Sequence, residues 1–145
     1  FYLRFIKTHD LDDNNSWLDR LDNPDVRAWS GYAFEQICLA HLFQIKNALG
    51  IASVQTKSSA WRGSDGTQQA QVDLVIDRRD HAVNLCEMKF SVNTFSIDKS
   101  YAEELRRKVG VFKTATKTRK SIFLTFIVLR SMILSPLEDV TQSLS

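Results

Sequence analysis

The chain is poor in the residues that mark special structural classes. Its 145 residues include two cysteines, two prolines and five glycines, and no stretch is repeated or low in complexity. Cys38 and Cys86 lie in apolar patterns without disulfide or zinc spacing, which favours reduced core residues in a cytoplasmic protein. No run approaches the roughly 20 apolar residues of a membrane span, and no signal peptide is recognised, so we expect no membrane partner.

The excess of one sign of charge is small. The net charge of +2 does not by itself indicate nucleic-acid binding. Its distribution is uneven, with aspartates concentrated before residue 26 and no acid between residues 106 and 120. That basic run is typical of a solvated helix face, and it becomes a candidate phosphate track only beside an active site.

With 43% hydrophobic residues the chain can form one globular domain with a substantial core. We expect a linker and the tail of a preceding element over 1–23, the domain over 24–129, and a separate tail over 130–145. Because the sequence opens at Phe1, we expect a piece of a longer protein. In the first half of the chain the patterns predict a helical turn over 24–29, a helix from a Ser30 cap to Gly50, a strand over 51–56 and a loop or hairpin tip over 57–69. Strands over 71–77 and 84–90, an Asp98-capped helix to 114 and a buried strand over 121–129 are expected to follow.

The two central strands carry charge where buried strands should carry none. They read as an antiparallel hairpin, and if Asp77 pairs with Val83, Asp73 falls opposite Glu87. Lys89 then lies on the same face as Glu87, because side chains alternate along a strand.

A divalent metal is the physical reason that fits best, because two neighbouring carboxylates repel unless one is protonated or a cation lies between them. Mg²⁺ (or Mn²⁺) accepts a few carboxylate oxygens together with water and phosphate. Asp73 and Glu87 are therefore candidate metal ligands, and Lys89 a candidate to position a nucleophilic water. The alternative is an exposed cross-strand ion pair.

The element order, with Asp73 and Glu87-x-Lys89 on adjacent strands, resembles the PD-(D/E)xK nuclease superfamily over about residues 29–129. This resemblance implies a restriction-endonuclease-like α/β core: a four-stranded mixed sheet flanked by helices, in the order α-β-β-β-α-β. It also implies that an acid on the first core helix assists catalysis, and Glu35 matches that place. The alternative for Glu35 is a solvent-facing helix residue.

A closer resemblance is to the C-terminal nuclease-like domain of bacterial and archaeal AAA-type ATPases. It is carried by three segments of this sequence: Trp29–Glu35, Gln69–Leu74 and Cys86–Phe90. The resemblance implies ATPase and winged-helix regions in the same parent chain. The chain holds no Gly-x-x-x-x-Gly-Lys-Ser/Thr motif, so ATPase activity cannot reside in it. After Ile127 the sequence departs from the ending that the family leads us to expect.

Four further residues are candidates for contact with nucleic acid. Trp61 and Arg62 could stack on a base or bind phosphate, although a role in anchoring a loop is the alternative. Tyr101 and Arg106 follow the Glu87-x-Lys89 strand, in a region that the resemblance implies can touch substrate. His41 falls on the apolar stripe of its helix and is interpreted as a packing residue.

Together these residues predict metal-dependent hydrolysis of phosphodiester bonds in DNA by part of a larger ATPase. The competing hypothesis is a nuclease fold that is weakly active or inactive and serves as an interaction or targeting module of an AAA-type ATPase. The sequence leaves open DNA against RNA, cleavage specificity and oligomeric state.

Overall fold

The structure, a computed structural model, describes residues 24–91 and 95–130, so the predicted linker and tail lie outside the described residues. The elements along the chain are α1 (Pro24–Ala40), α2 (Leu42–Ala48), β1 (Thr56–Ser64), β2 (Gln69–Arg78), β3 (Ala82–Ser91), α3 (Lys99–Thr116) and β4 (Ser121–Arg130). Within the described ranges, none of the helices combines the length and apolar character needed to cross a bilayer.

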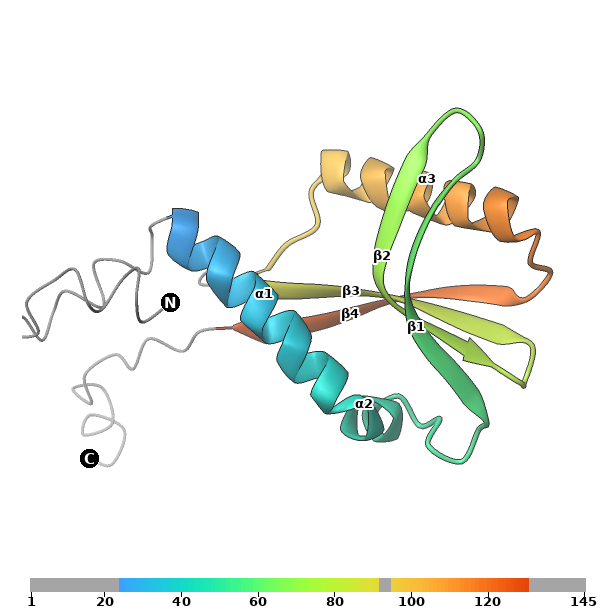
Figure 1. The fold of residues 1–145 in the computed structure, drawn as a ribbon, viewed down its shortest axis with the longest axis horizontal. Helices are drawn as coiled ribbons and strands as arrows, with labels where there is room; N and C mark the ends of the chain where they lie inside the picture. Colours follow the sequence, from blue (N-terminus) through green and yellow to red (C-terminus); the bar gives the residue numbers. More distant parts are fainter. Residues whose placement is uncertain (1–23, 92–94, 131–145) are drawn as a thin grey trace, which may run out of the picture.

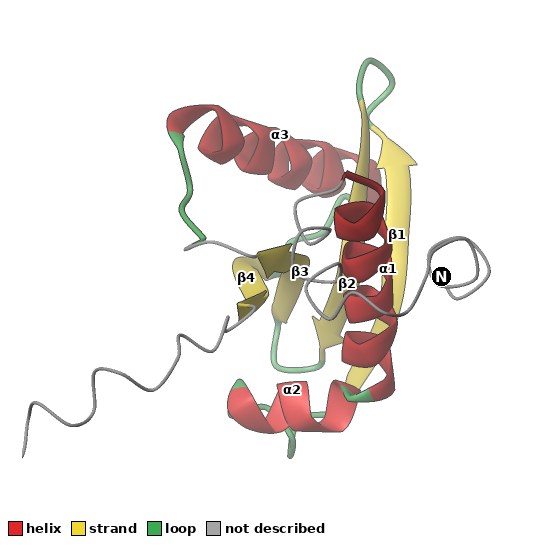
Figure 2. Cartoon of the chain, turned by 90° about the vertical axis from the view of Figure 1, so that its left-hand side faces the viewer, coloured by secondary structure: helices red, strands yellow, loops and turns green. Residues whose placement is uncertain are grey.

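The strands form one mixed sheet in the order β1-β2-β3-β4, with antiparallel pairs except between β3 and β4, which run parallel. α1 covers one face of the sheet and α3 the other, as Figures 1 and 2 show. The predicted α/β class and the four-stranded mixed sheet flanked by helices are therefore confirmed.

Each face of the sheet has its own apolar core. On the α1 face, Phe34 and Cys38 pack with Leu74, Ile76 and alternate residues of β3. On the α3 face, Phe112 packs with Val72, Val83 and Leu85. The central strands β2 and β3 are buried because both of their faces are covered, which explains their nearly continuous apolar sequence.

The predicted register of the central hairpin is confirmed over residues 74–77 of β2, because Asp77 pairs with Val83 and Leu74 with Cys86. The pairing ends there, so the predicted cross-strand pair of Asp73 with Glu87 is not part of the ladder. The predicted helix start at Ser30 is wrong, because α1 runs through that serine without a break. The break between helices falls at His41, which has φ −114° and ψ 31° and lies between α1 and α2. The ring of His41 is exposed and its Nδ1 lies 2.8 Å from the Ile37 carbonyl oxygen, which corrects its interpretation as a packing residue. Gly50 follows α2 at φ +69°, as expected for the residue after a helix end.

Two strand predictions are corrected. Residues 51–55 form no strand, and their apolar side chains Ile51 and Val54 instead pack into the α1-side core from a connection. β1 occupies most of the segment predicted as a loop or hairpin tip, and residues 65–68 alone form the tip between β1 and β2. β4 is present as predicted but is not buried, because it forms an edge of the sheet and four of its large apolar side chains are 38–51% exposed.

Candidate active site

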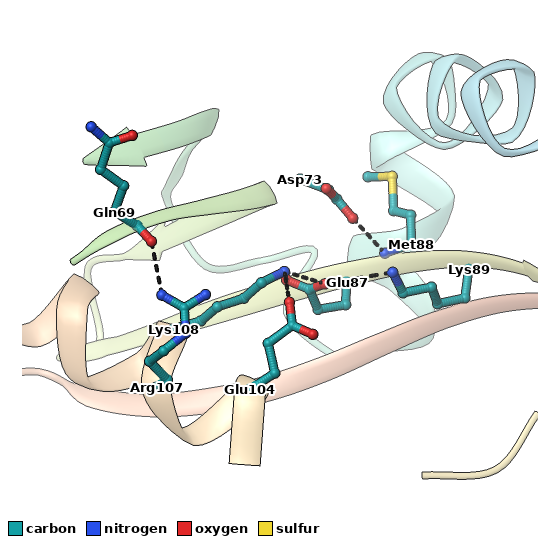
Figure 3. Close-up of polar contacts among 8 residues, drawn as sticks. All are labelled: Gln69, Asp73, Glu87, Met88, Lys89, Glu104, Arg107 and Lys108. Carbon is teal, nitrogen blue, oxygen red and sulfur yellow. Dashed lines mark hydrogen bonds and ion pairs between the residues drawn. The ribbon is translucent and has the colours of Figure 1, made fainter. Parts of the chain in front are cut away.

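Asp73 lies where β2 separates from β3. Pairing between the two strands covers residues 74–77 of β2 and stops before Asp73, whereas β2 remains paired with β1 as far as Gln69. In place of a backbone carbonyl, the Oδ2 atom of Asp73 accepts a hydrogen bond of 3.0 Å from the Met88 N–H (Figure 3). The side chain thus continues the ladder for one step and is held beside β3.

Glu87 is the most deeply buried charged residue among those that the structure describes, at 1% exposure. Its two carboxylate oxygens each accept a hydrogen bond of 2.9 Å from Lys108 Nζ of α3. Lys89 Nζ lies 4.0 Å from Glu87 Oε2, and Glu104 lies 3.9 Å from Lys108 one helical turn earlier. Figure 3 shows the two ammonium groups on either side of the carboxylate.

The acids at this point influence one another electrostatically. Burial raises the pKa of Glu87 above its ordinary value, Lys108 opposes that increase, and the Asp73 charge adds to it. Burial also raises the pKa of Glu35, to which the charges of Asp73 and Glu87 contribute while Lys89 opposes them. Glu35 is half-buried on α1, and the charges of the hairpin acids act on it.

Tyr101, at the start of α3, borders this acidic cluster. Burial, followed by the charges of Glu87, Glu104 and Asp73, raises the pKa of its phenol to about 12. Its hydroxyl is buried and has no hydrogen-bond partner among the described residues, and Lys89 Nζ lies 5.5 Å from its ring centroid. A neutral phenol at this place is a hydrogen-bond donor with unused capacity.

A groove of about 440 Å³ leads away from Asp73 between the outer half of β2 and α3. Its lining includes three cationic side chains, Arg62, Arg107 and Lys108, and the amides of Gln69 and Gln71. Arg62 donates to the Gln71 side chain at 2.6 Å, and Arg107 donates to the Gln69 carbonyl at 2.8 Å. The guanidinium groups are thus held in place while keeping further N–H donors for a ligand.

Lys89 lies 4.0 Å from Glu87 and 5.5 Å from the ring centroid of Tyr101, and Asp73 is held at the N–H of the neighbouring Met88. Glu35 is linked to these residues through their charges, and Arg62 lines the adjoining groove. Trp61 lies in β1, not in a loop, and packs edge-on against Phe112 with centroids 4.9 Å apart, so its contacts are those of an anchor.

Arg106 lies away from the acidic residues. It lines a separate apolar groove between α3 and β4, together with Leu105 and Leu124. The residues on α3 that face the acids are instead Glu104, Arg107 and Lys108, which the sequence analysis did not single out. The available signal was the i,i+4 spacing of Glu104 and Lys108 within a basic helix.

The metal ligands that this site offers most directly are two carboxylates, those of Asp73 and Glu87. Across residues 24–91 and 95–130, no three His, Cys, Asp or Glu side chains gather closely enough to hold a metal ion. Mg²⁺ keeps several waters and is commonly bound through one or two carboxylates, so Asp73 and Glu87 fit it in kind and number. Lys108 would have to withdraw from Glu87, because its ammonium already contacts both oxygens of that carboxylate.

Comparison of the chain with protein-family models, curated proteins and solved structures gives no match.

Proposed function

We propose that this domain hydrolyses phosphodiester bonds of nucleic acid, with DNA as the leading substrate, in a reaction that depends on Mg²⁺ or Mn²⁺. The observation that carries the proposal is the combination at the end of the β2–β3 hairpin: Asp73, buried Glu87 and Lys89 share one site. A structural ion pair explains Glu87 and Lys108. It does not explain why a second carboxylate, that of Asp73, is held at the N–H of the next residue, Met88.

Each side chain has a role in this proposal. Asp73 and Glu87 hold the cation, which when bound polarises a phosphate oxygen and makes a bound water more acidic. Lys89 remains 39% exposed in its side chain, so it can reach a water and the charge that develops on phosphorus. Glu35 assists from α1 by accepting a proton or a hydrogen bond, which its raised pKa favours.

The groove beside Asp73 supplies a path for the sugar–phosphate backbone. Arg62 and Arg107 flank it from β1 and α3, and guanidinium groups bind phosphate oxygens through paired N–H donors. Cationic side chains in such a groove give affinity without base specificity. This local placement of positive charge supports nucleic-acid binding better than the net charge of the whole chain does.

One observation favours the competing proposal, a nuclease fold that serves as a weakly active or inactive module of an AAA-type ATPase. Lys108 already neutralises Glu87 with two hydrogen bonds of 2.9 Å, so the buried carboxylate is stable without a metal. In that case the groove and the exposed surfaces bind a partner, including the ATPase and winged-helix regions of a parent chain, and cleavage is absent.

Metal-dependent nicking of supercoiled plasmid tests the two proposals. We expect the native chain to relax plasmid when Mg²⁺ or Mn²⁺ is titrated in, and to be silent in excess chelator. Asp73→Asn, which removes one of two anionic ligands, should reduce the rate by about 100-fold, the scale of losing one essential electrostatic group. No nicking at any metal concentration would support the module instead.

Metal binding should also be visible in stability. If the ion binds Asp73 and Glu87 in the folded state alone, Mn²⁺ should raise the melting temperature of the native chain by binding linkage. Asp73→Asn should abolish that increase and, without metal, should change the stability little, because an asparagine oxygen can still accept from the Met88 N–H. Strong destabilisation of Asp73→Asn in chelator would mean that Asp73 is a structural partner rather than a metal ligand.

A further inference from the structure

The two edges of the sheet differ in the protection they carry. β1, at one edge, contains Lys57 and Arg62, and its register with β2 shifts between Ser59 and Trp61. Charges and bulges of this kind are how proteins prevent edge strands from pairing with other chains. β4, at the other edge, runs for eight residues from Ile122 to Leu129 without a charge, a proline or a glycine. In the part of the chain that the structure describes, no strand pairs with its outer side.

The exposed apolar side chains of β4 have a symmetric arrangement. Phe123 and Leu129 are 51% and 47% exposed, and Leu124 and Val128 are 38% and 40% exposed. Phe123 and Leu129 are equally far from Phe126, and so are Leu124 and Val128. The odd-numbered pair lies on the α1 face and the even-numbered pair on the α3 face, since residues alternate along the strand and Leu124 borders α3.

We propose that β4 is a dimerisation edge at which two copies of this chain pair antiparallel, with Phe126 at the two-fold axis. In that register Phe123 of one copy lies opposite Leu129 of the other, and Leu124 lies opposite Val128. Each exposed apolar side chain therefore meets another one on the same face of a continuous sheet, which is the contact that stabilises strand pairs. An interface of this kind is isologous and closes at two copies, so each β4 edge is paired and neither is left open to a further chain.

Charge and space are compatible with a second copy as the occupant. In this register residues 123–129 of the two copies pair with one another and none of them is charged, so no like charges meet among them. On the α3 face, an apolar groove of about 360 Å³ lined by Ile97, Leu105, Val109 and Leu124 adjoins the edge. It offers apolar surface beside the place where the partner strand brings Val128. The proposal is independent of the nuclease chemistry.

Sedimentation equilibrium of the whole chain across the micromolar range tests the proposal. We expect a concentration-dependent species of twice the 16.6 kDa chain mass. Leu124→Lys with Val128→Lys should weaken the dimer by at least about tenfold, because like charges would then lie directly opposite each other. A matched control, Ile37→Lys with Phe43→Lys on the helices, changes two other exposed apolar residues, at 54% and 67% exposure, and should leave the dimer intact.

Mixing two single variants tests the register. Leu124→Lys and Val128→Glu should form a heterodimer more tightly than either variant forms a homodimer, since the two charges lie opposite each other. Leu124→Lys mixed with Leu129→Glu should show no such gain, because those residues lie on different faces. A native chain that stays monomeric, a double-lysine variant that still dimerises, or equal gains in both mixtures would each overturn the proposal.

Discussion

Lys89→Ala should lower metal-dependent plasmid cleavage by about 100-fold or more, the magnitude associated with losing one acid–base or electrostatic group. Lys89 is a cleaner target than the acids because it lies 4.0 Å from Glu87 and its side chain is 39% exposed, so its removal leaves both metal ligands and the Lys108 contact in place. The fold and the stabilisation by Mn²⁺ should therefore persist while the rate falls.

Lys57→Ala is the matched control for this experiment. Lys57 is an exposed lysine on β1 that pairs with Asp77, at the end of the central hairpin away from Asp73. Its loss should leave cleavage unchanged within a factor of about two, as expected for a surface substitution away from the site. Equal cleavage by native and Lys89→Ala protein would indicate a contaminating nuclease and would contradict the proposed role.

Lys108→Met should destabilise the domain by about 3 kcal/mol at neutral pH, because removing one partner of a buried pair leaves an uncompensated charge. The Glu87 side chain is 2% exposed and that of Lys108 is 15% exposed, so solvent screens this pair weakly. Lys89, also near Glu87, keeps the expected loss at the lower end of the range. Denaturant unfolding of Lys108→Met, and of the same variant combined with Glu87→Gln, measures the effect, and the double variant should recover most of the loss.

The same loss should depend on pH in a defined direction. Burial raises the pKa of Glu87 in the folded state above its ordinary value, so the folded protein binds a proton at Glu87 more tightly than the unfolded chain does. Protonation of Glu87 therefore stabilises the folded state fully below the unfolded-state pKa, and this stabilisation is lost as pH rises through the folded-state pKa. The difference in stability between native and Lys108→Met protein should therefore shrink as pH falls from 7 toward that pKa. A difference that stays constant with pH would show that Lys108 contributes packing rather than charge.

The central hairpin could be predicted from the sequence because its determinants are local. Asp77 and Val83 flank a short polar turn, and the alternation of the two strands then places each residue as far as the pair of Leu74 with Cys86. Asp73 lies one residue beyond that pair and is placed by its hydrogen bond from the Met88 N–H. Asp98 likewise caps α3 by accepting from the Tyr101 N–H at 2.7 Å, a signal contained within four residues.

The rest of the fold depended on contacts that the sequence does not encode locally. β1 is mostly polar because it lies at an edge of the sheet, and its sequence therefore resembled that of a loop. Ile51 and Val54 resembled a strand because they pack in the core, although they lie in a connection. The apolar run of β4 indicated a strand but could not distinguish an edge from the interior.

The cation that contacts Glu87 was also beyond a sequence prediction. Lys108 is 21 residues away along the chain, and it meets Glu87 only because α3 packs across the sheet with that side of the helix turned inward. Arg106, two positions earlier, is turned toward β4 for the same reason. A basic run names its members, but the rotation of the helix decides which of them reaches the acids.

The separation of β2 from β3 at Asp73 has a mechanical consequence. Beyond that residue β2 is paired with β1 alone, and Figure 1 shows this two-stranded arm rising away from the rest of the sheet beside α3. A lone pair of strands is marginally stable and bends more easily than a broad sheet. The arm is braced against α3 by the Trp61–Phe112 contact and by the hydrogen bond from Arg107 to Gln69. The distance between the arm and α3, and with it the width of the groove, is therefore set by these two contacts and not by pairing of the arm with β3.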